Sequence, residues 1–139
     1  MDLLTLDPRV LHQAYWEGPD VPAPIIRVGD AEDPLGGVVR LPLTPPHDLI
    51  LGRSFGARCT MERCVRPSGF PCAVADPLGL VLLKLEAGAP QDAYDVLALL
   101  DATKALGHRD LREEVEAHLP SLDPEARRFW RKLQSLRES

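Results

Sequence analysis

A nearly all-apolar segment, Leu78 to Leu85, is the feature that most constrains how this chain can fold. Lys84 is the only charged residue in that segment. A helix that is apolar nearly all round has to be buried on most of its sides. Asp76-Pro77 precedes the segment and is typical of a helix start, whereas Gly88 is placed to end the helix. We therefore expect a buried helix over residues 77–87.

Lys84 needs either a partner or access to water, because burying an unpaired ammonium is costly or lowers its pKa. Asp92 and Asp95 follow the Gly88–Pro90 turn and share one face of the next expected helix. We expect one or both of them to reach Lys84. Structural explanations stand beside a functional one, because a lysine can keep its head in water and a helix dipole favours Asp92 in the first turn.

The rest of the second half also has a helical pattern. We expect helices over residues 90–103, 109–118 and 124–137. The last of these carries a group of basic residues, namely Arg127, Arg128, Arg131, Lys132 and Arg137. Such a group is typical of a solvated helix face with favourable charge near the C-terminus, and it is also able to bind an acidic partner.

The first half alternates short apolar runs with turn residues. We expect strands over residues 3–6, 25–28, 38–41, 47–51 and 70–74, helices over 8–15 and 55–65, and a loop over 29–37. This order predicts an α+β fold with a small mixed sheet flanked by helices. The expected domains are an α/β core over residues 1–75 and a helical subdomain over 76–139 packed on it.

Asp48 stands at the start of the run His47 to Leu51, which is apolar on both faces as in a central strand. A carboxylate held at the edge of a buried strand is well placed to bind a metal. The same residue also suits the capping of the turn that follows Pro45-Pro46. The sequence leaves these two interpretations equal.

Composition excludes several classes of protein. The chain has 139 residues and a formal net charge of −5, which argues against a general nucleic-acid coat but not against a local basic patch. No apolar run approaches the roughly 18 residues that cross a bilayer, so no membrane partner is expected. Three cysteines, Cys59, Cys64 and Cys72, are expected to be free thiols in a cytoplasmic protein.

Two stretches of the chain resemble nucleotidyltransferase-fold proteins of the AbiEii toxin type. The first is Asp48-Leu49-Ile50-Leu51-Gly52-Arg53, followed by a helix and a strand. The second is the run from Asp76 to Val96, in which Lys-x-x-Ala-Gly-x-x-x-Asp-x-x-Asp is the most specific part. Asp2-Leu3-Leu4-Thr5 also resembles the end of that family's Asp-x-Asp strand, so the resemblance covers roughly residues 2–100.

The resemblance implies metal-dependent transfer of NMP from NTP to an RNA or protein acceptor. It implies that Asp2 and Asp48 bind Mg²⁺, an ion that prefers carboxylate and phosphate oxygens. It implies that Lys84, with Arg53, contacts the nucleotide. Asp92 or Asp95 would then correspond to the family's later acidic motif.

One part of the family pattern has no counterpart here. The chain begins at Met1-Asp2, so neither the phosphate-holding Gly-Ser motif nor the first acidic residue is present. We expect either a start placed too far downstream or a shortened relative with impaired activity. A missing element would leave a sheet edge exposed, which predicts self-association through that edge. A non-catalytic binding module and a purely structural domain are the alternatives.

Overall fold

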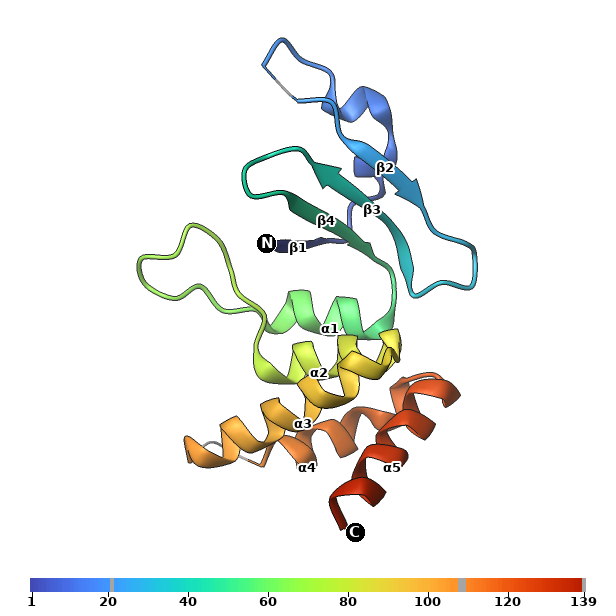
Figure 1. Cartoon of the computed structure of the whole chain (residues 1–139), viewed down its shortest axis with the longest axis vertical. Helices are drawn as coiled ribbons and strands as arrows, with labels where there is room; N and C mark the ends of the chain where they lie inside the picture. Colours follow the sequence, from blue (N-terminus) through green and yellow to red (C-terminus); the bar gives the residue numbers. More distant parts are fainter. Residues whose placement is uncertain (21, 108–109, 139) are drawn as a thin grey trace. The chain divides into compact units, whose positions relative to one another are not determined.

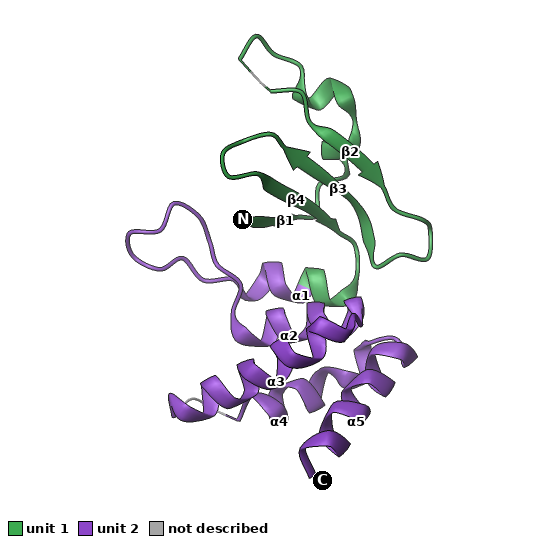
Figure 2. Ribbon diagram, viewed as in Figure 1, with its two compact units in different colours: residues 1–58 green, residues 59–139 purple. Residues whose placement is uncertain are grey.

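The computed structural model describes residues 1–20, 22–107 and 110–138 of the chain. The chain divides into two compact units, one over Met1–Arg58 and one over Cys59–Ser139 (Figure 2). The described residues form a mixed α+β fold with a four-stranded sheet and five α-helices. The sheet lies in the first unit, which we call unit 1, and four of the helices lie wholly in the second, which we call unit 2.

Unit 1 is built on a mixed sheet. Its strands are β1 (Asp2–Thr5), β2 (Ile25–Val28), β3 (Leu35–Leu41) and β4 (His47–Gly52). They are arranged in the order β1-β4-β3-β2, with β1 parallel to β4 and the other pairs antiparallel (Figure 1). The expectation that residues 47–51 form a central strand is confirmed, because β4 is hydrogen-bonded on both sides.

One face of this sheet carries the core of unit 1. Val39 and Leu51 from the sheet and Val10 from the preceding segment are buried together. That segment was expected to form one α-helix over residues 8–15, which is wrong: it forms two 3₁₀ turns, η1 (Pro8–Leu11) and η2 (Gln13–Trp16). His12 between them has an extended backbone, with φ −92° and ψ 128°, so an α-helix cannot continue through it.

The loop expected over residues 29–37 ends earlier than its glycines suggest, because β3 already begins at Leu35. Gly36 and Gly37 lie inside the strand. A Cβ on Gly36 would lie 2.7 Å from a side-chain carbon of Leu51, and one on Gly37 would lie 2.5 Å from the carbonyl oxygen of Arg27. These glycines therefore allow a close approach within the sheet, where their appearance in the sequence indicated a turn.

Helix α1 (Phe55–Arg63) runs from unit 1 into unit 2. The helices that follow it are α2 (Pro77–Ala87), α3 (Pro90–Ala105), α4 (Leu111–His118) and α5 (Pro124–Glu138), with a short turn η3 (Leu119–Ser121) before the last. These helices confirm the expected pattern, although the predicted start at residue 109 lies outside the described residues. The strand predicted over residues 70–74 is wrong, because only an isolated bridge joins Val65 to Val74.

Caps predicted from the sequence fix the ends of α2. The Asp76 side chain accepts a hydrogen bond from the Gly79 backbone N–H at 2.8 Å, which satisfies one of the free donors of the first turn. Gly88 ends the helix in the left-handed conformation, with φ 66°. Asp123 caps α5 in the same way through the Ala126 N–H. The Asp-Pro pairs at residues 76–77 and 123–124 therefore mark helix starts, whereas Asp33-Pro34 precedes strand β3.

Helix α2 forms the centre of unit 2. Four of its apolar side chains, Leu78, Val81, Leu82 and Leu85, are at most 1% exposed. The helix contacts α3, α4 and α5. Trp130 and Leu133 of α5 are buried to the same degree. No helix within the described part of the chain combines the length and the apolar character required to cross a membrane.

One buried polar group in unit 2 has no partner among the described residues. Gln134 of α5 is 8% exposed, and both its Oε1 and its Nε2 lack a hydrogen bond. Burial of an amide without a partner destabilises the folded state.

We predict that Gln134→Met raises the free energy of unfolding by about 1–3 kcal/mol, because it removes the unpaired amide at nearly constant shape. Urea denaturation of the two proteins measures the change. Gln91→Met, at an exposed position of α3, is the matched control and should change little. A loss of stability in Gln134→Met would contradict the assignment of an unpaired amide.

Candidate functional site

Asp2 and Asp48 lie side by side in the sheet of unit 1. The parallel register of β1 and β4 pairs Asp2 with Asp48. Side chains of register-paired residues on neighbouring strands point to the same face. The two predicted metal-binding residues therefore share one sheet face, opposite to the face that carries Val39 and Leu51.

Arg40 joins this carboxylate pair from the other side of β4. It is register-paired with Asp48 across β3 and β4. Its Nε donates to one carboxylate oxygen of Asp48 at 2.9 Å, and its Nη2 donates to the other at 3.0 Å. Such a two-point contact is the strong form of an arginine–carboxylate pair. A row of three charged residues, Asp2, Asp48 and Arg40, thus runs across three strands.

The charges of this row affect one another. The hydrogen bonds from Arg40 lower the pKa of Asp48, and the Arg27 guanidinium and the chain's amino terminus act in the same direction. The hydrogen bonds to Asp48 raise the pKa of Arg40, and the negative charge of Asp2 adds to this. Asp48 is therefore a carboxylate at neutral pH, as a metal ligand must be.

A shallow pocket of about 270 Å³ lies on the same face, lined by Ile25, Arg27, Val38, Arg40 and Asp48. Its walls combine two guanidinium groups, one carboxylate and two apolar side chains. Arg27 is exposed and makes no ion pair with any described residue. The pocket can therefore accept a negatively charged group beside an apolar one.

Arg53, which the resemblance assigns to the nucleotide, is engaged with backbone in this structure. Its Nε donates to the carbonyl oxygen of Asp33 at 2.8 Å, and its Nη2 donates to the carbonyl oxygen of Asp30. These bonds hold the loop that leads into β3. The predicted role of Arg53 in nucleotide binding stays a prediction.

In unit 2, Lys84, Asp92 and Asp95 form a cluster. The Nζ of Lys84 lies 3.0 Å from Oδ1 of Asp92 and 2.7 Å from Oδ2 of Asp95. The lysine comes from the last turn of α2, whereas the two aspartates come from the first two turns of α3. The cluster therefore links the two helices across the turn at Gly88.

Asp92 has two roles in this cluster. Its second carboxylate oxygen accepts the Ala89 backbone N–H at 2.9 Å, which caps the start of α3. Its side chain is 10% exposed, whereas that of Asp95 is 40% exposed. Because a buried carboxylate needs a counter-charge, Lys84 and the cap together account for Asp92. A structural role, which the sequence analysis allowed beside a functional one, is thus sufficient to explain Asp92.

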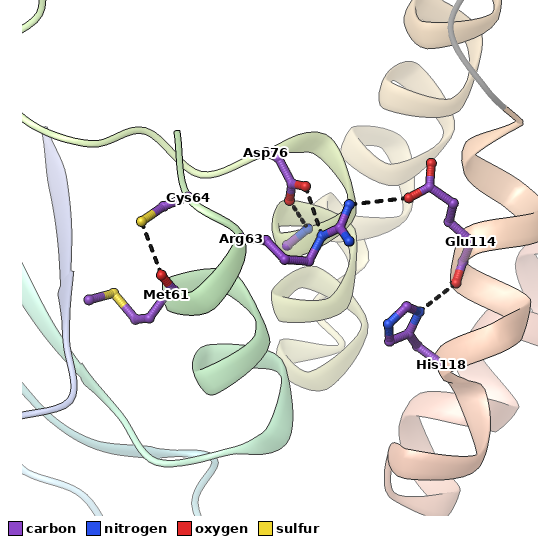
Figure 3. Close-up of polar contacts among 7 residues, drawn as sticks. Met61, Arg63, Cys64, Asp76, Glu114 and His118 are labelled. Atoms are coloured by element: carbon purple, nitrogen blue, oxygen red, sulfur yellow. Dashed lines mark hydrogen bonds and ion pairs between the residues drawn. The ribbon is translucent and has the colours of Figure 1, made fainter. Parts of the chain in front are cut away.

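A further charged cluster in unit 2 was not anticipated from the sequence (Figure 3). Nε of Arg63 donates to Asp76 at 2.9 Å, and Nη2 of Arg63 donates to Glu114 at 3.3 Å. This arginine joins the end of α1 to the N-cap of α2 and to α4. Because the three residues are far apart in the chain, no local spacing indicates the cluster.

No group of three or more histidine, cysteine, aspartate or glutamate residues within the described ranges is arranged to hold a metal ion. In the described part of the chain, Asp2 and Asp48 thus have no third histidine, cysteine, aspartate or glutamate arranged with them to hold a metal ion. The cysteines Cys59, Cys64 and Cys72 are free, as predicted. Burial raises the pKa of the Cys59 thiol, which disfavours its nucleophilic thiolate form.

No protein-family model, curated protein or solved structure matches this chain. The predicted site residues fall into two sets, Asp2, Asp48 and Arg53 in unit 1, and Lys84, Asp92 and Asp95 in unit 2. The structure brings Asp2 close to Asp48, and it brings Lys84 close to both of its aspartates.

We predict that Lys84→Met lowers the free energy of unfolding by about 1–3 kcal/mol, because it leaves the Asp92 carboxylate buried without its counter-charge. Urea denaturation measures the loss. Lys104→Met, at an exposed position near the end of α3, is the matched control. Equal stabilities of the two variants would show that the Lys84 cluster contributes nothing to the fold.

The Lys84 cluster also predicts a dependence of stability on pH. Hydrogen bonding to Asp95 and then to Asp92 raises the pKa of Lys84 above its ordinary value. A lysine whose pKa is higher in the folded chain than in the unfolded chain stabilises the fold. This stabilisation is fully present at pH values below the pKa of the unfolded chain, about 10.4, and it is lost as the pH rises through the pKa of the folded chain.

The difference in unfolding free energy between the wild type and Lys84→Met should therefore stay constant up to about pH 10 and shrink as the pH rises from about 10 to about 12. Urea denaturation of both proteins across this range measures it. A difference that stays constant or grows with pH would contradict the ion pairing of Lys84.

Proposed function

We propose that this chain is a nucleotidyltransferase-like protein in which Asp2 and Asp48 bind a divalent metal together with a nucleoside triphosphate. The observation that carries the proposal is the β1–β4 register, which pairs the two carboxylates on one sheet face. Placement on opposite faces would have excluded a shared metal. The resemblance of residues 2–100 to nucleotidyltransferases supports the same assignment.

The residues present fit a magnesium–nucleotide complex better than a metal held by protein alone. Magnesium is commonly bound by one or two carboxylates, with substrate phosphates and water completing its shell. Two neighbouring carboxylates meet this need without a third protein ligand. A bound metal would neutralise charge on the phosphates during nucleotidyl transfer.

The arginines of the pocket support the binding of a triphosphate. Arg27 and Arg40 line the pocket next to Asp48. A guanidinium group binds phosphate oxygens at two points, and Arg27 is not engaged in an ion pair within the described structure. The apolar Ile25 and Val38 beside them offer a surface for a base or sugar.

With the nucleotide bound by these residues, the acceptor supplies the group that attacks it. In the proposed reaction the oxygen of an acceptor hydroxyl bonds to the α-phosphorus of the NTP and gives its proton to solvent. The bond from that phosphorus to the bridging oxygen of the β-phosphate breaks, and pyrophosphate leaves. Asp48 and Asp2 would position the phosphates through the metal. Lys84 as a phosphate contact stays a prediction from the resemblance, since its ammonium bonds to Asp92 and Asp95.

A second function, that of a non-catalytic binding module, is favoured by one observation. Arg40 occupies both oxygens of Asp48, so a metal has to displace or share that contact. In a binding module the pair would simply stabilise the sheet. This alternative predicts that Mg²⁺ with NTP does not raise the melting temperature, whereas a protein partner does.

The test is the binding of Mn²⁺ with a non-hydrolysable NTP, followed by titration calorimetry and by thermal unfolding. We predict that ligand at about one hundred times its dissociation constant raises the melting temperature by about 5 °C or more. Asp48→Asn and Asp2→Asn should each weaken metal–nucleotide binding by roughly tenfold or more, because each removes a charged ligand.

Asp20→Asn, at an exposed position of unit 1, is the control and should bind as the wild type does. Nucleotidyl transfer is then measured with α-phosphate-labelled NTP and RNA or protein acceptors. No change in melting temperature with any metal–nucleotide pair would overturn the proposal and leave the binding module.

A further inference from the structure

Helix α5 presents a basic face to solvent. Arg128, Arg131 and Lys132 are exposed, and Arg127 beside them is half-buried. Residues three and four apart on a helix are neighbours, so these four side chains occupy one side of α5. The helix contains five basic and two acidic residues, a formal charge of +3, although the whole chain carries −5. Positive charge is therefore concentrated on this helix.

The basic face is not neutralised by its surroundings. The ion pairs of α5 in the described structure involve its last residues, Arg137 with Asp101 and Glu138 with Arg112. None of the described ion pairs includes Arg128, Arg131 or Lys132. Because like charges at these spacings repel one another, the cluster opposes folding of its own helix. A bound polyanion would relieve that repulsion.

The opposite side of α5 holds the helix in a fixed orientation. Ala126, Trp130 and Leu133 are at most 1% exposed. The indole N–H of Trp130 donates to the carboxylate of Glu116 in α4 at 2.8 Å. The arginines and the lysine thus stand on a rigid support, which lowers the entropy lost when they bind a partner.

We propose that the exposed face formed by Arg128, Arg131 and Lys132 binds the sugar–phosphate backbone of single-stranded RNA. A nucleic-acid strand carries a charge on every nucleotide, so a row of cations meets several phosphates at once. A helix that lies on a membrane needs an exposed apolar face, whereas the apolar face of α5 is buried. Acidic peptides usually dock into a groove or onto a sheet edge, and the cations here stand on a convex helix surface.

This inference names the acceptor class left open in the proposed function, and in its choice of RNA it rests on that function. Its test is independent of nucleotide transfer. Binding of a fluorescently labelled 20-nucleotide RNA to the full chain is measured by anisotropy, without NTP or metal, at several salt concentrations.

The double variant Arg128→Gln/Arg131→Gln should weaken RNA binding by roughly tenfold at low salt and reduce the salt slope by about 1.4, the value for two phosphate contacts. Arg66→Gln/Lys104→Gln removes the same charge from exposed positions outside α5, and it should bind as the wild type does. Circular dichroism of both variants confirms that α5 remains folded.

Equal effects of the two double variants would overturn the proposal, since they would show a non-specific charge effect. A polyglutamate peptide or phosphatidylserine vesicles that bind α5 more tightly than RNA at the same salt would also overturn it. If Mn²⁺ with NTP fails to bind while the RNA result holds, the proposed function fails and the RNA site stands.

Discussion

The ion pairs of Lys84 are the interaction on which the helical unit depends. Helix α2 buries Leu78, Val81, Leu82 and Leu85, whereas Leu80 is exposed and Lys84, the one charged group within the apolar run, is partly buried on the other side. Asp92 and Asp95 pair with this lysine from the start of α3. Asp92 also caps α3, so one carboxylate both pairs with the lysine and satisfies a backbone N–H at the start of the next helix. The most recognisable motif of the chain is therefore part of its scaffold.

The two units divide the predicted site between them. In unit 1 the pairing of β1 with β4 places Asp2 beside Asp48, and Arg40 adds a cation to the same row. In the proposed function, this arrangement would supply ligands for a metal–nucleotide complex. In unit 2 the predicted residues satisfy one another. The case for nucleotide chemistry consequently rests on the sheet, and the case for RNA rests on α5.

Local signals were enough to predict the helices of unit 2. Asp-Pro pairs, Gly88 and the apolar run each act within one or two turns, so their effect does not depend on distant packing. The signals failed where distant contacts decide, as at Gly36 and Gly37, whose lack of a side chain serves the packing of Leu51 and the approach of β2. The Arg40–Asp48 and Arg63–Asp76 pairs were missed for the same reason, because they require the register and the tertiary fold.

A double-mutant cycle over Lys84→Met and Asp95→Asn tests most directly whether the lysine is committed to the link between α2 and α3. Asp95 is the better partner for the cycle because it caps no backbone group in the described structure. Urea denaturation of the four proteins should give a coupling energy of about 0.5–1.5 kcal/mol in favour of the wild-type pair. A coupling energy within about 0.3 kcal/mol of zero would contradict the account and leave the ammonium of Lys84 free for another partner.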